Sequence, residues 1–215
     1  MKLYDSRGAP SPRRVRIYLA EKHIEVERVM VDLRSGEHLE AAFLAINPRG
    51  AVPALELDDG EVVCESAAIC RYFEALHPTP ALFGVTPVEI ARIESWTRRI
   101  ESDGYAAAVY VLRNTVDAFR DRPAAGKWPA MPQIPELGAR GVIMWDVFVE
   151  TLEAQLSAGH AAGRTWIATD TYSFADITAL VTIDFAARCK LAIPEEARAL
   201  RRWHAAASAR PSAQA

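Results

Sequence analysis

The chain has 215 residues, half of them hydrophobic and a quarter charged, which is typical of a globular protein with one or two domains. Lys plus Arg against Asp plus Glu gives 10 against 13 up to Leu76 and 15 against 15 after it, so no basic face indicates a nucleic-acid or anionic-membrane partner. No apolar run is long enough for a membrane span, and three cysteines without metal-type spacing predict neither a metal site nor a disulfide framework.

The first 76 residues predict a small α/β domain. The predicted elements are a strand at 2–5, a turn-rich loop at 6–12, a helix from 12 or 13 to 22, a strand at 25–32, a helix at 37–46, a hairpin at 54–64 and a helix that Ser66 caps and that continues to about Leu76. Two strands joined through a helix should lie parallel, and the hairpin should then extend the sheet in the antiparallel direction. Because the first strand begins at Lys2, we expect no signal peptide and a cytoplasmic location.

The rest of the chain predicts an all-helical domain. Prolines and a glycine mark a linker at 78–87, and strand signals almost vanish beyond it. The predicted helices run from 87 to about 119 with a possible break at 102–104, then 137–157, 177–189 and 194–209. The expected domains are therefore 1–77 and 88–215, joined by the linker 78–87. The proline-rich segment 122–135 fits no regular element and is interpreted as a lid or an interface loop.

The residues Ser173-Phe174-Ala175-Asp176 have the form of a capping box at the start of a strongly apolar helix. We interpret this motif as structural, and a Ser173→Ala change should cost about 1 kcal/mol of stability.

A docking site for a small peptide is predicted around Val52-Pro53 and Glu65-Ser66. Pro53 has no N–H, and a cis Val52–Pro53 bond would leave the N–H and C=O of Val52 open to pair with a bound peptide as a short added strand. The helix start at Ser66, beside the Glu65 carboxylate, would receive the α-carboxylate and α-ammonium of a zwitterion. The alternative is a turn proline and an ordinary cap.

Several motifs occur together along nearly the whole chain. They are Ser35-Gly36-Glu37-His38-Leu39 with Phe43, Asn47-Pro48 with Val52-Pro53, Glu65-Ser66, Ser173-Phe174-Ala175-Asp176, and Arg201-Arg202-Trp203. In this order they resemble the cytosolic glutathione transferase family; each motif is weak alone, but together they are specific. The resemblance implies a thioredoxin-like α/β first domain, an all-α second domain and a homodimer.

The resemblance also implies how glutathione, the co-substrate, is held. Val52 and Pro53 match the pair that binds its cysteinyl backbone, and Glu65 and Ser66 match the positions that hold its γ-glutamyl end. His38 matches a position near the glycine carboxylate in some branches.

Residues of the second domain are assigned less directly. Asp103 matches an acidic residue that reaches the γ-glutamyl amine across the dimer. The electrophile should bind between the domains, and Tyr105, Tyr110, Arg113 and Asn114 could face it. Helical spacing does not decide whether these four point to the electrophile, to the core or to solvent.

The usual catalytic side chain of the family is missing, since Ala9 occupies the position where related branches carry Cys or Ser, and Tyr4 is the only tyrosine on the first strand. The local sequence resembles a bacterial and fungal branch that uses a water or a hydroxyl next to the helix start. Ionising a thiol near neutral pH needs about 2.7 kcal/mol, more than a helix start alone supplies. We therefore predict that Ser11, or a water it holds, stabilises the thiolate with the first-helix amides; the alternative for Ser11 is a plain helix cap.

The predicted function is conjugation of glutathione to small hydrophobic electrophiles, a detoxification reaction, in a homodimer with no metal and with neither nucleic acid nor membrane as partner. The alternatives are a non-catalytic glutathione-binding module of the same fold, or a glutathione-dependent isomerase or peroxidase. A disulfide reductase is disfavoured because Ala9 replaces the expected nucleophile.

Overall fold

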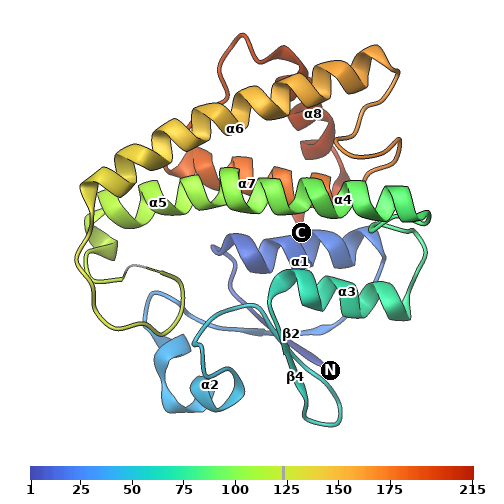
Figure 1. Ribbon diagram of the computed structural model, residues 1–215. Helices are drawn as coiled ribbons and strands as arrows, with labels where there is room; N and C mark the ends of the chain where they lie inside the picture. The colour runs from blue at the N-terminus through green and yellow to red at the C-terminus, as the bar shows by residue number, and fades with distance from the viewer. Residues whose placement is uncertain (123) are drawn as a thin grey trace. The chain divides into compact units, whose positions relative to one another are not determined.

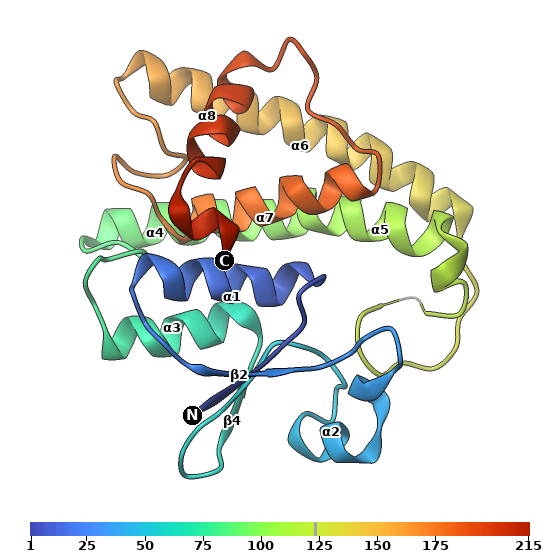
Figure 2. The same ribbon diagram turned by 180° about the vertical axis from the view of Figure 1, so that it is seen from behind.

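A computed structural model describes residues 1–122 and 124–215 (Figures 1 and 2). The chain forms two compact units. Unit 1 comprises Met1–Pro80, Ala124–Ala130 and Ala215, and unit 2 comprises Ala81–Pro123 and Met131–Gln214. Residues 124–130, expected from the sequence to belong to the helical domain, therefore contact the first unit. In the described ranges, no helix has the length and apolar character that a membrane crossing requires.

Unit 1 contains a mixed sheet in the order β2-β1-β3-β4. The strands are β1 (Lys2–Asp5), β2 (Glu27–Met30), β3 (Ala54–Glu56) and β4 (Val62–Cys64). Strand β1 pairs in parallel with β2 and antiparallel with β3, and β3 pairs antiparallel with β4. This confirms the predicted parallel pair and the hairpin that extends it.

Helices cover both faces of this sheet (Figures 1 and 2). Helices α1 (Pro10–Glu21) and α3 (Ser66–Leu76) lie on one face, and α2 (Ala41–Ile46) lies on the other. The predicted helix at 37–46 is instead a 3₁₀ turn, η1 (Glu37–Leu39), followed by α2, because Glu40 between them has an extended backbone.

A buried ionic cluster joins the ends of α1 and α3. The Nζ of Lys22 lies 2.5 Å from Glu74 Oε2 and 2.5 Å from the His77 carbonyl, and the lysine side chain is 0% exposed. The Tyr18 hydroxyl donates to the same Glu74 oxygen. Because the ammonium and the carboxylate are paired and hydrogen-bonded, the helix ends are held in one arrangement.

All the regular elements described in unit 2 are helices, and loops join them. Its longer helices are α4 (Pro87–Arg99), α5 (Ala106–Thr115), α6 (Pro135–Ala161), α7 (Phe174–Arg188) and α8 (Arg198–Ser208), and its short ones are η2 (Ile100–Tyr105), η3 (Asp117–Phe119) and η4 (Pro211–Gln214). The expected break at 102–104 is wrong, since the π-helical turn η2 carries α4 directly into α5. Gly104 is needed for packing, because a Cβ there would lie 2.6 Å from the Phe148 ring.

Helix α7 forms the core of unit 2, and the capping box at its start is confirmed. The Ser173 N–H and hydroxyl both donate to Asp176 Oδ2, at 3.0 and 2.8 Å. Asp176 Oδ1 also accepts from the Ile167 N–H at 3.0 Å and from Trp203 Nε1 at 2.9 Å. Burial raises the pKa of Asp176, while these four hydrogen bonds favour its charged form. The carboxylate thus ties α7 to the preceding loop and to α8.

Candidate functional site

The turn before β3 is organised from within by a buried asparagine. The Val52–Pro53 bond is cis. Asn47 is 3% exposed; its Nδ2 donates to the Ala51 carbonyl at 2.7 Å, and its Oδ1 accepts from the Arg49 N–H at 3.1 Å. Among the described residues, Val52 makes no backbone hydrogen bond. Its N–H and C=O therefore have no backbone partner within the described chain and can pair with an extended peptide.

The start of α3 has an unusual backbone. Glu65 has φ 69°, a positive value that is uncommon outside glycine and that is strained for a side chain of this size. Glu65 is the N-cap, its carbonyl accepts from the Ile69 N–H at 3.0 Å, and Ser66 is the first helical residue. The expectation that Ser66 caps the helix is therefore wrong by one position. The change leaves the Ser66 side chain, 3% exposed, free for another contact at the helix start.

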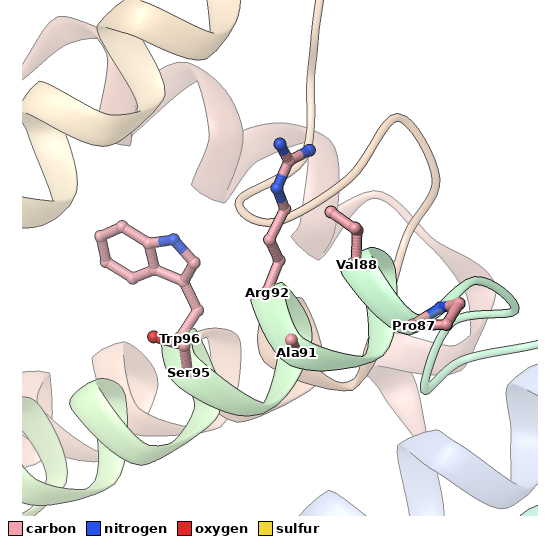
Figure 3. Close-up of a pocket in the computed structure, with 6 residues that line it drawn as sticks. All are labelled: Pro87, Val88, Ala91, Arg92, Ser95 and Trp96. Atoms are coloured by element: carbon pink, nitrogen blue, oxygen red, sulfur yellow. The ribbon is translucent and has the colours of Figure 1, made fainter.

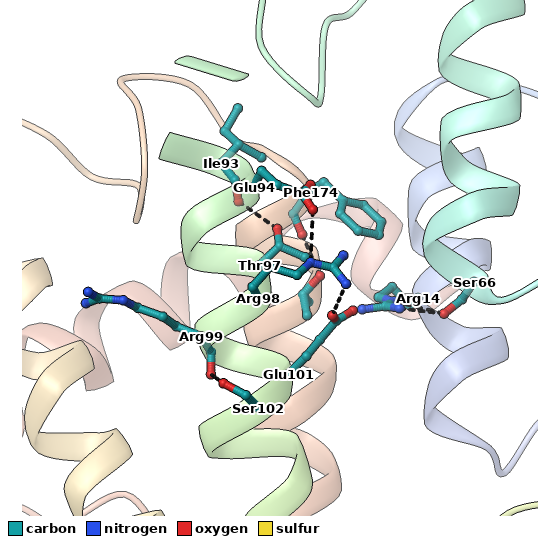
Figure 4. A network of polar contacts seen from close by, with 11 residues as sticks. Arg14, Ser66, Ile93, Glu94, Thr97, Arg98, Arg99, Glu101, Ser102 and Phe174 are labelled. Atoms are coloured by element: carbon teal, nitrogen blue, oxygen red, sulfur yellow. Dashed lines mark hydrogen bonds and ion pairs between the residues drawn. The ribbon is translucent and has the colours of Figure 1, made fainter. Parts of the chain in front are cut away.

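That contact comes from Arg14 on α1 (Figure 4). Arg14 Nε and Nη2 donate to Ser66 Oγ at 3.1 and 2.6 Å. A hydroxyl has two acceptor lone pairs and one hydrogen, so with both lone pairs taken the Ser66 hydroxyl can only donate elsewhere. An O–H donor, a guanidinium and the unpaired N–H groups of a helix start together favour a carboxylate.

We refer to Ser66, Arg14 and the N–H groups at the start of α3 as the anion seat. The carboxylate of the neighbouring Glu65 faces solvent. Its Oε1 lies 3.6 Å from Arg49 Nη1, and the two side chains are 73% and 63% exposed. An exposed ion pair of this length is weak and can yield to a ligand ammonium. The site therefore offers a negative group next to a positive one, which is the pattern that an α-amino acid end requires.

The N-terminus of α1 differs from the sequence prediction. The helix begins at Pro10 and its N-cap is Ala9, so the alternative of Ser11 as a plain cap is wrong. The Arg13 N–H already bonds to the Ala9 carbonyl at 3.4 Å, and Pro10 and Pro12 have no N–H. Ser11 therefore supplies the one first-turn amide that has no intrahelical acceptor, and it carries a hydroxyl as well.

The loop from β1 to this helix start is fixed by a buried ion pair. Arg16 Nη1 lies 2.6 Å from Asp5 Oδ1, with side chains 7% and 1% exposed, and Arg16 Nη2 donates to the Arg7 carbonyl at 3.4 Å. A run of arginines such as Arg13, Arg14 and Arg16 is typical of a solvated face, but Arg16 is buried. The sequence around Arg16 does not show this contact, because the ion pair with Asp5 forms only when α1 packs on β1.

The Tyr4 side chain contacts Phe43 and Glu56 rather than the start of α1. Its ring packs edge-on against Phe43 at 5.8 Å, on the α2 face of the sheet, opposite to α1. Its hydroxyl donates to Glu56 Oε2 at 2.7 Å, and this hydrogen bond, together with burial, raises the pKa of Tyr4 to about 12. A tyrosine held this way is a weaker acid than a free one and faces away from the α1 start.

We therefore expect Tyr4→Phe to leave the pKa of the bound glutathione thiol and the turnover number unchanged. Titrating the ultraviolet absorbance of the thiolate against pH measures the first quantity, and a steady-state conjugation assay measures the second. A rise of about one pKa unit, equivalent to about 1.4 kcal/mol, would assign Tyr4 a role in activation.

His38 is buried, and its carbonyl lies against Gly50 of the turn before β3. It is 3% exposed within η1, and its carbonyl would be 2.9 Å from a Cβ placed on Gly50, which has φ +58°. Gly50 is thus required both for its backbone conformation and for the close approach. With so little of His38 exposed, its assignment to the glycine carboxylate continues to rest on the family resemblance.

The residues predicted from unit 2 are brought into separate local contacts. Asp103 is exposed on η2, and its Oδ1 accepts from the Ser102 hydroxyl at 2.7 Å. The Tyr105 ring lies 5.5 Å from the Phe185 ring. Tyr105 is partly exposed.

Arg113 and Asn114 both hold the segment that follows α5. Arg113 Nη1 donates to the Arg122 carbonyl at 3.1 Å, its guanidinium lies 4.5 Å from the Phe119 ring centre, and burial lowers its pKa. Asn114 Oδ1 accepts from the Ile134 N–H at 2.9 Å, directly before α6. Both predicted electrophile-binding side chains thus have structural partners. Pro123, within the predicted lid, lies outside the described residues.

Among the described residues, no cluster of three or more His, Cys, Asp and Glu side chains could hold a metal ion. The arrangement in unit 1 can instead bind a peptide main chain, an α-carboxylate and an α-ammonium.

Comparisons with known proteins agree with this geometry. Residues 9–76 match the family model "Glutathione S-transferase, N-terminal domain", and residues 146–211 match "Glutathione S-transferase, C-terminal domain". Glutathione S-transferase 2 of Saccharomyces cerevisiae is 36% identical over 223 residues, which cover 99% of this chain and 87% of the relative. The chain belongs to the glutathione S-transferase family.

Two further relatives of this glutathione S-transferase are informative. The crystal structure of Gtt2 from Saccharomyces cerevisiae has a TM-score of 0.87 and 36% identity, and the match covers 100% of this chain and 99% of that one. Maleylacetoacetate isomerase of Pseudomonas aeruginosa is 45% identical over 201 residues, covering 76% of this chain and 94% of the relative. The predicted family, its fungal and bacterial branch, and the thioredoxin-like plus helical fold are confirmed.

Proposed function

We propose that this glutathione S-transferase conjugates the thiolate of glutathione to small hydrophobic electrophiles, a detoxification reaction. One observation carries the binding half of the proposal: the open main-chain pair of Val52 lies in the same unit as the Arg14–Ser66 anion seat and the Glu65 carboxylate. An extended γ-glutamyl tripeptide has the matching groups in that order.

In this proposal the cysteinyl N–H and C=O pair with Val52, next to Pro53. The α-carboxylate accepts from the Ser66 hydroxyl and from the N–H groups at the start of α3, while the α-ammonium displaces Arg49 from Glu65. His38 is assigned to the glycine end, and Asp103 of a partner subunit to the ammonium.

Activation of the thiol is assigned to Ser11. Two of the three first-turn amides of α1 are replaced by Pro10 and Pro12, so the helix start contributes less than the usual value of about 0.3–1 kcal/mol. A hydrogen bond to a charged acceptor contributes about 1.5–3 kcal/mol. The Ser11 N–H and hydroxyl, directly or through a water, can together supply the required 2.7 kcal/mol or so.

We expect Ser11→Ala to raise the pKa of the bound thiol by about 1–2 units, because the amide remains and one charge-assisted hydrogen bond is lost. The measurement is the same thiolate titration, with Ser11→Thr as the variant that keeps a hydroxyl. Pro10→Ala should act in the opposite direction, since it restores an amide donor in the first turn. An unchanged titration in Ser11→Ala would contradict the role of the hydroxyl.

A second candidate function is glutathione-dependent isomerisation, which the identity to the Pseudomonas maleylacetoacetate isomerase favours. A peroxidase or a binding module without turnover are further alternatives. An aryl halide, a diketo diacid with one cis carbon–carbon double bond and a hydroperoxide, each assayed with glutathione, separate the three reactions. Retention on immobilised glutathione without any turnover would indicate the binding module. Tyr105 keeps its proposed role towards the second substrate, as do Arg113 and Asn114 if their present partners are released.

We also propose a cytoplasmic homodimer that uses the exposed face of α4 (Figure 3). This face has a shallow hollow of about 400 Å³. Its lining residues are Pro87, Val88, Ala91, Arg92, Ser95 and Trp96. Val88 is 57% exposed and lines this hollow together with Trp96, so the face has apolar area that a partner subunit could cover. Light scattering should give the dimer mass for the natural chain and the monomer mass for Val88→Arg; dimers in both would exclude this face.

A further inference from the structure

The segment Ala124–Ala130 belongs to unit 1 although the chain on both sides of it belongs to unit 2 (Figure 1). It touches the turn that precedes the cis prolyl bond. The Lys127 N–H donates to the Arg49 carbonyl at 2.6 Å. Gly126 approaches the same oxygen so closely that an added Cβ would lie 2.3 Å from it. We refer to the Gly126–Lys127 backbone as the clamp.

The clamped carbonyl is at the centre of the proposed peptide site. The Arg49 N–H bonds to Asn47 Oδ1, its carbonyl accepts from the clamp, and its guanidinium lies near Glu65. Asn47 thus holds the N–H of Arg49, and the clamp holds its carbonyl. Only two residues, Gly50 and Ala51, separate Arg49 from Val52, so a shift of this peptide unit moves the backbone groups that Val52 presents.

The clamp is itself held in place by local contacts. Trp128 Nε1 donates to the Ala125 carbonyl at 3.0 Å, which closes a turn around Gly126. The bond from Trp128 thus stabilises the turn that presents the Gly126–Lys127 backbone to the Arg49 carbonyl.

We infer that the clamp sets the position of the turn at Arg49–Val52 for glutathione binding, and that Gly126 is a positioning residue of the enzyme. The inference rests on the proposed role of Val52. Gly126 suits this role for two reasons: its φ is +88°, and the contact with the Arg49 carbonyl leaves no room for a side chain.

The test is Gly126→Ala beside Gly60→Ala. Gly60 has φ +89°, nearly the same backbone strain, and no atom within 4 Å of an added Cβ, so the pair isolates the contact with Arg49. We expect Gly126→Ala to raise the KM and the dissociation constant for glutathione about 10-fold, with kcat at saturating glutathione unchanged. Gly60→Ala should leave these values within about 2-fold. Trp128→Phe, which loses the bond to Ala125, should give a smaller rise of about 3-fold.

Amide hydrogen exchange supplies a readout that does not depend on activity. In Gly126→Ala the amides of Lys127 and Gly50 should exchange faster, and in Gly60→Ala they should not. Faster exchange with an unchanged glutathione affinity would overturn the inference, since the clamp would then not serve the site. Equal effects of the two glycine variants would overturn it as well. If the natural chain shows no heat with glutathione, the proposed function fails and the role of the clamp in binding fails with it; hydrogen exchange in the two glycine variants then still shows whether the clamp holds the turn.

Discussion

Replacing Asp176 by alanine should lower the free energy of unfolding by about 3–5 kcal/mol, a large part of the 5–15 kcal/mol that is usual for a domain. The reason is the number of donors that the carboxylate satisfies. Two main-chain N–H groups, an indole N–H and a hydroxyl all point to it, and the residue is 0% exposed. No water can replace the acceptor without opening the core, so these donors would be left unpaired. Urea unfolding followed by circular dichroism measures the loss.

Graded variants separate the bonds at this carboxylate. Trp203→Phe removes one donor and Ser173→Ala removes another. Each should lower the free energy of unfolding by about 1 kcal/mol, in addition to the cost of the lost packing. The free energy of unfolding should fall more in Asp176→Asn than in these two variants and less than in Asp176→Ala. The asparagine oxygen still accepts hydrogen bonds, but its NH₂ group faces other donors. If Asp176→Ala unfolded at the same urea concentration as the natural chain, the carboxylate would not be the link between α7 and α8.

Removing the Ser66 hydroxyl should weaken glutathione binding by about 10- to 150-fold, which corresponds to the loss of one hydrogen bond to a charged group. Ser66 is 3% exposed, so its interaction with the α-carboxylate is little screened by water. The two bonds from Arg14 leave the hydroxyl hydrogen for the ligand, and Ser66→Ala also removes the acceptor of both bonds. Isothermal titration calorimetry with glutathione gives the dissociation constants.

A ligand variant makes the assignment specific. A tripeptide that carries γ-aminobutyrate in place of the γ-glutamyl group lacks only the α-carboxylate. It should bind the natural chain and Ser66→Ala equally weakly, because the interaction is absent in both. Ser66→Thr, which keeps a hydroxyl, should bind glutathione within about 3-fold of the natural chain. If Ser66→Ala also weakened binding of this truncated peptide by about 10- to 150-fold, Ser66 would not be the residue that binds the α-carboxylate.

The sequence predicted well those features that depend on neighbouring residues. The helix from Ser66 to Leu76, the hairpin around Gly60 and the capping box at Ser173 are local patterns, and each is present in the structure. The cis bond at Val52–Pro53 also followed from one short motif. Helix boundaries were less accurate at α1, because Pro10 is compatible with a first helical position as well as with a loop.

The polar contacts that build the site were harder to predict. Arg14 and Ser66 are 52 positions apart, and nothing in either neighbourhood shows that they meet. The run Arg13-Arg14-Val15-Arg16 looks like a solvated face, yet Arg16 is buried against Asp5, and that contact depends on how α1 packs on β1. Gly126 was one glycine among several prolines, and its closeness to Arg49 is visible only in three dimensions.

The buried ionic cluster at the end of α1 has a practical consequence for labelling. The chain has four lysines, and Lys22 is enclosed and paired while Lys2, Lys127 and Lys190 are exposed. An amine-reactive dye should therefore leave Lys22 unmodified. With arginine at positions 2 and 190, Lys127 becomes the one accessible ε-amine among the lysines. A fluorophore placed there would report, in real time, any movement of the polypeptide beside the tripeptide pocket as substrate arrives.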